Sequence, residues 1–187
     1  MIVDDATGSI RLWDASWCAR DLITAVHHEM RAAPWVSDRA LGRVARRMTC
    51  AFGQPGLTYR YSGTTKTAQP WHDATAQLAD WVGHMCGGAA FNFCLGNLYE
   101  TRAATLGWHA DDERDLVAGA PIAIVSLGSP RVMGLRRPAD GATREVLLSH
   151  GTLLVMAGAT QRHWQHCIVR GVDDMPRISL TFRSVRS

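Results

Sequence analysis

The sequence predicts an α+β domain whose core is a double-stranded β-helix (jelly roll) with helices on its N-terminal side. Short segments rich in β-branched and apolar residues follow one another from residue 91 to the end, and turn residues separate them. Two helical patterns occur before residue 91. Many short strands at even spacing are typical of a double-sheet jelly roll. The expected strands are 91–99, 105–109, 121–128, 131–136, 144–149, 152–157, 163–168 and 177–185.

A short strand and then a helix are expected at the start of the chain. The strand covers residues 9–13, and Ser16 is the expected N-cap of the helix. Apolar residues mark one face of this helix, and Pro34 ends it. We interpret it as a helix that supports the core.

Residues 35–48 show no strong periodicity and are rich in arginine, so a basic loop is expected there. Its arginines include Arg46 and Arg47, which would suit contact with a phosphate backbone. Leu41 or Val44 could then push into a base stack. A solvated basic loop is the alternative interpretation.

Two strands and a second helix are expected before the jelly roll. The strands cover 48–52 and 57–62, and the turn-forming residues 53–56 join them. The helix begins at Asp73 and ends at the glycine pair 87–88. Its inward residues are expected to be Leu78, Trp81, Val82 and Met85.

Composition indicates one globular domain. The chain has 187 residues and is 47% hydrophobic, which allows a substantial core. Its net charge is +3, and Lys66 is the one lysine among 20 basic residues, so 19 are arginine (20 − 1). An arginine-rich surface suits phosphate contact, although genomic base composition would give the same bias.

Cysteine usage indicates a reducing compartment. The five cysteines are odd in number and lack CxxC spacing, which argues against a disulfide framework. The first residues carry no signal-peptide pattern, and no apolar run approaches the roughly 20 residues of a membrane span. We therefore expect a cytoplasmic monomer with no membrane partner.

The segment 107–113 carries the first candidate metal ligands. His109 and Asp111 are two residues apart, so on a strand they share one face. A third ligand must come from far along the chain, and His166 is the candidate, with His163 in reserve. Two histidines and one carboxylate leave open positions on the ion, as in non-haem Fe(II) oxygenases. A surface pair in a polar loop is the alternative for His109 and Asp111.

The C-terminal segment 176–183 alternates between polar and apolar residues, which predicts a half-buried strand. Its polar face carries Arg177, Ser179, Thr181 and Arg183. Arginine binds carboxylates through two parallel hydrogen bonds. A dicarboxylate such as 2-oxoglutarate would therefore fit between a metal and Arg177. The two arginines are on the order of 20 Å apart on a straight strand, so we assign Arg183 to the metal end.

The chain resembles a known family, the AlkB-type Fe(II)/2-oxoglutarate dioxygenases, and within this family it resembles the duplex-DNA repair branch. The resemblance covers about residues 47–185. It rests on motifs that occur in one order at the spacing of the family. They are the segments 56–63, 69–71, 91–99, 109–113, 121–128, 150–154, 163–166 and 176–183.

The resemblance implies one dioxygenase domain with the cofactor Fe(II) and the cosubstrates 2-oxoglutarate and O2. Within it, 1–47 would be helical support and basic loop, 48–90 a nucleotide-recognition lid and helix, and 91–187 the jelly roll. The metal ligands would be His109, Asp111 and His166. Many members have Asn where this chain has Ser179, so the local hydrogen bonding there differs. The residues implied for 2-oxoglutarate are Asn97, Tyr99, Arg177, Ser179 and Arg183.

The implied reaction is oxidative demethylation of N-alkylated bases, such as 1-methyladenine or 3-methylcytosine, in DNA or RNA. The base would have to leave the stack to reach the metal. Tyr61 is expected to stack on it and Tyr59 to make a polar contact. Asp112, ranked above Glu113, would accept a bond from the exocyclic amine. The full set implied for the substrate is Tyr59, Tyr61, Asp112, Glu113, Arg136, Arg46 and Arg47.

Two other functions remain open. A small-molecule 2-oxoglutarate hydroxylase would keep the metal residues but would not need Arg46, Arg47, Tyr61 or Asp112. A non-enzymatic jelly-roll protein would bind a metal ion without turning over 2-oxoglutarate. The preferred strand type and the preferred lesion are not determined by the sequence.

Overall fold

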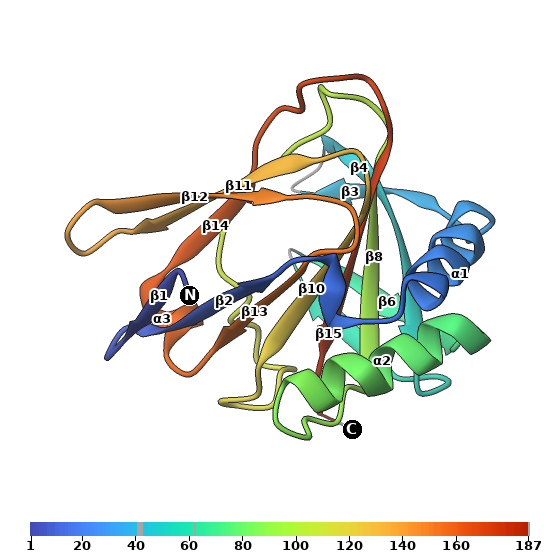
Figure 1. Cartoon of the computed structure of the whole chain (residues 1–187), viewed down its shortest axis with the longest axis horizontal. Helices are drawn as coiled ribbons and strands as arrows, with labels where there is room; N and C mark the ends of the chain where they lie inside the picture. The colour runs from blue at the N-terminus through green and yellow to red at the C-terminus, as the bar shows by residue number, and fades with distance from the viewer. Residues whose placement is uncertain (41–42, 62, 187) are drawn as a thin grey trace.

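The computed structural model describes residues 1–40, 43–61 and 63–186, and it has two facing sheets with helices on one side (Figure 1). The helices α1 (Arg20–Arg31) and α2 (Asp73–Met85) cover the outer face of the larger sheet. The α+β class and the jelly-roll core predicted from the sequence are confirmed. None of the helices in the described part of the chain is long and apolar enough to cross a membrane.

The larger sheet is antiparallel along its main path. Its strands lie in the order β1 (Val3–Asp5), β2 (Gly8–Trp13), β13 (Leu153–Ala157), β10 (Ile122–Gly128), β15 (Arg177–Arg183), β8 (Phe93–Tyr99), β4 (Arg43–Gly53) and β3 (Val36–Ala40). A short strand, β7 (Gln69–Pro70), pairs with β4 in parallel.

The smaller sheet lies opposite the middle of the larger one. Its order is β12 (Ala142–Leu148), β11 (Arg131–Arg137), β14 (Gln165–Ile168) and β9 (Leu106–His109). Apolar side chains from both sheets, such as Ile124 and Met133, form a core between them. The short helix α3 (Thr160–His163) leads into β14, and η1 (Ala15–Trp17) precedes α1.

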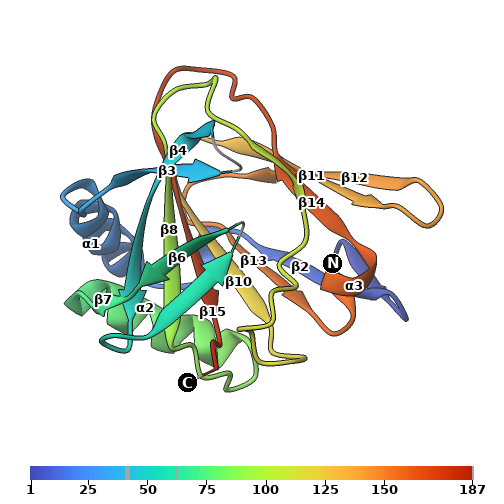
Figure 2. The ribbon, with the colours of Figure 1, turned by 180° about the vertical axis from the view of Figure 1, so that it is seen from behind.

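A separate hairpin of β5 (Thr58–Tyr61) and β6 (Thr64–Thr67) lies beside the loop that follows β9 (Figure 2). The backbone N–H of Arg60 donates to the carboxylate of Asp115 in that loop at 2.8 Å. The hairpin and the loop therefore meet at the open side of the two sheets.

Strand β15 is buried along its whole length, so the predicted half-buried strand is wrong in this respect. Its apolar residues Ile178, Leu180 and Phe182 pack beneath the helices. Its polar residues face the smaller sheet instead of solvent. Polar and apolar residues alternate along β15 as predicted, but the smaller sheet covers the polar face.

The predicted basic loop at 35–48 is also wrong, because residues 36–40 belong to β3 and residues 43–48 to β4. Strand β4 pairs with both β3 and β8, so contacts with distant segments stabilise it. Residues 53–56 form the expected turn, yet β5 pairs with β6 and not with β4. Leu41 lies outside the described residues, and the side chain of Val44 is not described.

The helices follow the sequence pattern with two corrections. Ala19, not Ser16, is the N-cap of α1, and Ser16 donates its backbone N–H to Asp14 at the start of η1. Helix α2 begins at Asp73 as predicted and stops before Gly87, whose φ is 73°. Trp81 was expected inside, but it is 46% exposed.

Candidate metal and cosubstrate site

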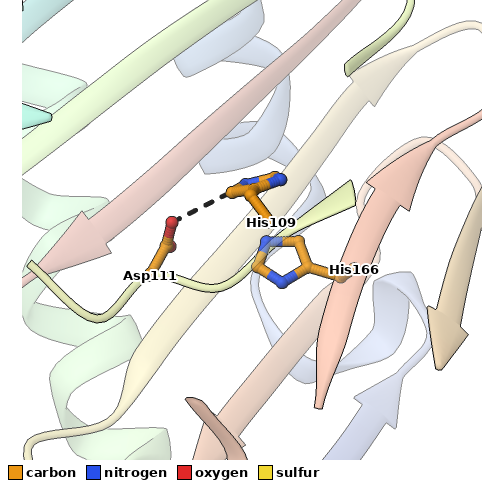
Figure 3. Close-up of side chains that lie close together, drawn as sticks. All are labelled: His109, Asp111 and His166. Atoms are coloured by element: carbon orange, nitrogen blue, oxygen red, sulfur yellow. Dashed lines mark ion pairs between the residues drawn. The ribbon is translucent and has the colours of Figure 1, made fainter. Parts of the chain in front are cut away.

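Strand pairing brings the candidate metal ligands together. His109 at the end of β9 lies directly opposite His166 of β14, and their rings are 4.1 Å apart between centroids. Asp111 follows two residues after His109 and turns back toward both rings (Figure 3). One ligand atom from each side chain lies within 4.8 Å of the others, so the three could hold one metal ion. His163 is exposed on α3 and does not belong to this group.

Hydrogen bonds orient two of these side chains. Nδ1 of His109 is 2.8 Å from the carbonyl oxygen of Gly107, which leaves Nε2 toward Asp111, 3.7 Å from Oδ1. The backbone N–H of Asp111 donates to Oε1 of Gln161 at 2.9 Å. Partners of this kind fix the orientation of metal ligands.

The pKa values of Asp111 and His166 are shifted in the directions that favour binding of a cation. Burial acts to raise the pKa of Asp111, but the charges of Arg183 and of the two histidines outweigh it and lower the pKa to about 2. Burial lowers the pKa of His166 to about 4. Near neutral pH, Asp111 is therefore ionised and His166 is neutral, which are the protonation states that a metal ion requires.

The triad opens into a cavity of about 270 Å³ between the two sheets. Its apolar wall includes Leu106, Ile124 and Met133. Its polar wall comes from β8 and from the inward face of β15, whose residues pair directly across the two strands. These polar residues are Asn97, Tyr99, Arg177, Ser179, Thr181 and Arg183.

Arg177 lies at the end of this wall beside Tyr99. It is fully buried, its Nη2 donates to Oγ of Ser126 at 2.9 Å, and its guanidinium carbon lies 5.2 Å from the centre of the Tyr99 ring. Its Nε and Nη1 have no hydrogen-bond partner among the described residues. A buried cation with unpartnered donors fits a carboxylate, so the residues present fit a dicarboxylate cosubstrate.

Arg183 lies at the metal end, as the sequence assignment had it. Its Nη2 donates to Oδ2 of Asp111 at 2.7 Å, and both side chains are almost fully buried. Burial acts to lower the pKa of Arg183, but the negative charge of Asp111 raises it. Arg183 thus holds a candidate metal ligand, whereas Arg177 remains available for an anion.

Aromatic and polar residues of the neighbouring elements complete the cavity. The rings of Tyr59 and Tyr61 are stacked with 5.4 Å between centroids, and the Tyr59 hydroxyl donates to Oε2 of Glu113 at 2.6 Å. Burial raises the pKa of both Tyr59 and Glu113. Nε of Arg47 donates to Oδ1 of Asn97 at 2.6 Å.

Three residues expected at the substrate lie outside this cavity. Asp112 is exposed and lines a neighbouring cavity of about 400 Å³, whereas Glu113 lines both, so the expected order of the two is reversed. Both carboxylates border the neighbouring cavity, but Glu113 alone of the two also reaches the cavity of the triad. Arg46 is exposed on β4. The guanidinium of Arg136 stacks on the Trp108 ring at 4.5 Å and donates a hydrogen bond to the side chain of Gln165, away from the cavity.

Three site residues were missed from the sequence. Ser126 interrupts an apolar run in β10, which was an available signal for a polar contact. Trp108 lines the cavity and is 42% exposed next to His109. Gln161 gave no signal, because its contact with Asp111 joins residues 50 apart in sequence.

Comparisons with known proteins agree with this geometry. The sequence model of the family described as the 2OG-Fe(II) oxygenase superfamily matches residues 15–183. DNA oxidative demethylase ALKBH2 of Mus musculus is 38% identical over 148 residues, which are 74% of this chain and 62% of the relative. Alpha-ketoglutarate-dependent dioxygenase alkB homolog 3 of Bos taurus is 37% identical over 150 residues, 74% of this chain and 51% of the relative.

The chain spans between half and about three fifths of the length of these two relatives. A solved structure described as that of OsALKBH1 superposes with a TM-score of 0.69 at 17% identity and covers 95% of this chain and 97% of the other, which supports the fold. The relatives confirm the resemblance to AlkB-type enzymes. Because the family model matches nearly the whole sequence, the chain belongs to the 2OG-Fe(II) oxygenase superfamily.

Proposed function

We propose that this protein oxidatively demethylates N-alkylated nucleobases in nucleic acid, using Fe(II), 2-oxoglutarate and O2. The observation that carries the proposal is the cluster of His109, Asp111 and His166 in a cavity that also contains a stacked tyrosine pair and Arg177, two of whose nitrogen atoms have no partner among the described residues. The names of the relatives support the reaction. They include a DNA oxidative demethylase, and we infer the same class of substrate for this chain.

The bound iron and 2-oxoglutarate would supply the oxidising chemistry, and the chain supplies binding, orientation and exclusion of water. His109, Asp111 and His166 would hold one side of the metal ion. Arg177 would bind the distal carboxylate of the cosubstrate. Tyr99 and Asn97 line the cavity next to it and would bind the same molecule.

Tyr59, Tyr61 and Glu113 would receive the target base. A methyl group on N1 of adenine or N3 of cytosine blocks pairing, which lowers the cost of extruding the base from a duplex. Stacking on a tyrosine ring is worth about 1–3 kcal/mol per base. Glu113 has the position from which an exocyclic amine could donate a hydrogen bond to its carboxylate.

A reducing compartment such as the cytoplasm and a monomeric state belong to the same proposal. All five cysteines, which are Cys18, Cys50, Cys86, Cys94 and Cys167, are free thiols in the structure, and this supports a reducing environment.

The test is release of formaldehyde and succinate with Fe(II), 2-oxoglutarate and oligonucleotides that carry 1-methyladenine or 3-methylcytosine. Single-stranded and duplex DNA and RNA should each be assayed. We expect turnover that requires the methylated strand, that Asp111→Ala abolishes and that Asp140→Ala retains. Asp140 is the matched control because it is a carboxylate on the exposed β11–β12 turn, paired with Arg137.

The other functions give different results. Succinate release that does not depend on nucleic acid would indicate a small-molecule hydroxylase. Metal binding without any succinate release would indicate a non-enzymatic metal-binding protein. Either result would overturn the proposal.

A further inference from the structure

A second buried arginine, Arg131, lies at the same end of the sheets as Arg177. It begins β11, and its side chain is on the same face as Met133 and Leu135, which pack between the two sheets. Arg131 is 1% exposed. A fully buried charge at this position needs a compensating group, because burial of an unpaired ion is costly.

The protein compensates this charge only in part. Nη2 of Arg131 donates to the carbonyl oxygens of Thr101 at 3.1 Å and of Met175 at 3.5 Å. Its Nε and Nη1 have no partner among the described residues, and none of the ion pairs found there involves Arg131. The charge of Arg131 acts on the carboxylate of Asp173, but Asp173 is exposed, and its carboxylate accepts a hydrogen bond from the Ser129 hydroxyl.

The Arg131 side chain is also tightly packed. A Cβ atom added at Gly171 would lie 1.5 Å from Nη1 and 2.2 Å from Cζ, so the β14–β15 loop covers the guanidinium with bare backbone. Thr101, Gly171 and Met175 come from two loops that both close this end of the sheets. Arg131 therefore has a fixed position.

Arg177 is a second buried cation, and the charge of Arg131 acts on it. The backbone brings them together, since Gly128 lies opposite Arg177 and the N–H of Ser129 donates to the carbonyl of Pro176 at 3.0 Å. Burial, and after it the charge of Arg131, lowers the pKa of Arg177.

Two buried cations thus lie at the same end of the sheets, Arg177 in the wall of the cavity and Arg131 behind it, and two nitrogen atoms of each have no partner among the described residues. Their mutual repulsion is unfavourable until an anion arrives. A ligand with a carboxylate at this end relieves the repulsion, whereas a ligand without one does not. The arrangement therefore discriminates between ligands by charge.

We propose that Arg131 is a positioning residue that acts through Arg177 and makes the cavity selective for a 2-oxo acid with a second carboxylate. This inference rests on the proposed function. Arg177 would contact the distal carboxylate, and Arg131 would strengthen the positive potential behind it. Arg131 lies beyond the residues that line the cavity, so it does not touch the ligand.

The test compares the dissociation constants of two ligands by calorimetry in the presence of Mn(II), without turnover. The ligands are 2-oxoglutarate and 2-oxobutyrate, which lacks the distal carboxylate. We expect the neutral variants Arg131→Met and Arg131→Gln to weaken 2-oxoglutarate about tenfold and to leave 2-oxobutyrate unchanged. Such a change matches two charges roughly 12 Å apart at an effective dielectric constant near 20. Arg131→Lys, which keeps the charge, should stay within about threefold of the original protein.

Equal weakening of both ligands would show a merely structural role and overturn the inference, as would no change in either. If the neutral variants do not fold, as judged by circular dichroism, Arg131→Lys decides. Retained preference for 2-oxoglutarate supports the inference, and lost preference refutes it. If the unaltered protein does not bind 2-oxoglutarate at all, the proposed function fails first, which is a distinguishable result.

Discussion

Replacing Arg183 by Met should strongly destabilise the metal-free protein. Arg183 and Asp111 form an ion pair at 2.7 Å whose side chains are 6% and 4% exposed. Removing one partner of a buried pair leaves the other charge uncompensated, which costs about 3–5 kcal/mol. For a chain of this size, that free energy corresponds to a melting temperature lower by roughly 6–20 °C.

The assay is urea and thermal unfolding of the protein in the presence of a chelator. Arg137→Met is the matched control, because Arg137 pairs with Asp140 at 2.6 Å, but 22% of the Arg137 side chain and 50% of the Asp140 side chain are exposed. Exposed pairs contribute little, so this variant should unfold close to the original protein. A second comparison adds Mn(II), whose charge should compensate Asp111 and reduce the loss in Arg183→Met.

Two results would refute this reasoning. One is an equal loss of stability in Arg183→Met and Arg137→Met, which would mean that burial does not decide the strength of the pair. The other is a double variant, Asp111→Asn with Arg183→Met, that is no more stable than Arg183→Met alone. Removal of both charges should recover part of the stability, because no uncompensated ion remains.

Two further predictions concern titration. Burial lowers the pKa of His166 in the folded protein to about 4, so between pH 6.5 and 4 this histidine is protonated in the unfolded chain but not in the folded one. The metal-free protein should therefore lose stability as the pH falls from about 6.5 to 4. Melting temperatures across that range should show a smaller loss for His166→Gln, and an identical loss would contradict the assignment. The Tyr59 hydroxyl lowers the pKa of Glu113, against the raising effect of burial, so Tyr59→Phe should raise that pKa further. Carboxyl NMR titration measures this shift, and an unchanged or lower value would exclude the hydrogen bond.

Local periodicity was enough to predict most of the elements. The alternation of residues 177–183 identified β15 and the face that carries its arginines, since successive strand residues point to opposite sides. The same geometry predicted that His109 and Asp111 share one side of a strand; the two side chains do lie together, but β9 ends at His109 and Asp111 follows it. The strands from β8 to β15 were found with small differences at their ends, because turn residues separate them.

Periodicity failed where pairing between distant segments stabilises a strand. Residues 36–40 and 43–47 carry little local signal, yet they form β3 and the first part of β4, because β3 pairs with β4 and β4 pairs with β8. The same limit applied to β15. Its polar face is buried only because a second sheet, formed by other parts of the chain, lies opposite it.

The sequence by itself determined the residue types of the site: a His-x-Asp pair, a distant histidine and a strand with two arginines. Only the tertiary structure decided which of them meet. The register of β9 against β14 sets His166, and not His163, opposite His109 across 57 residues (166 − 109). The conformation of the segment after Asp111 lets Glu113, and not Asp112, line the cavity. Such choices depend on strand register and on loop conformation, which arise from contacts between segments that no local pattern records.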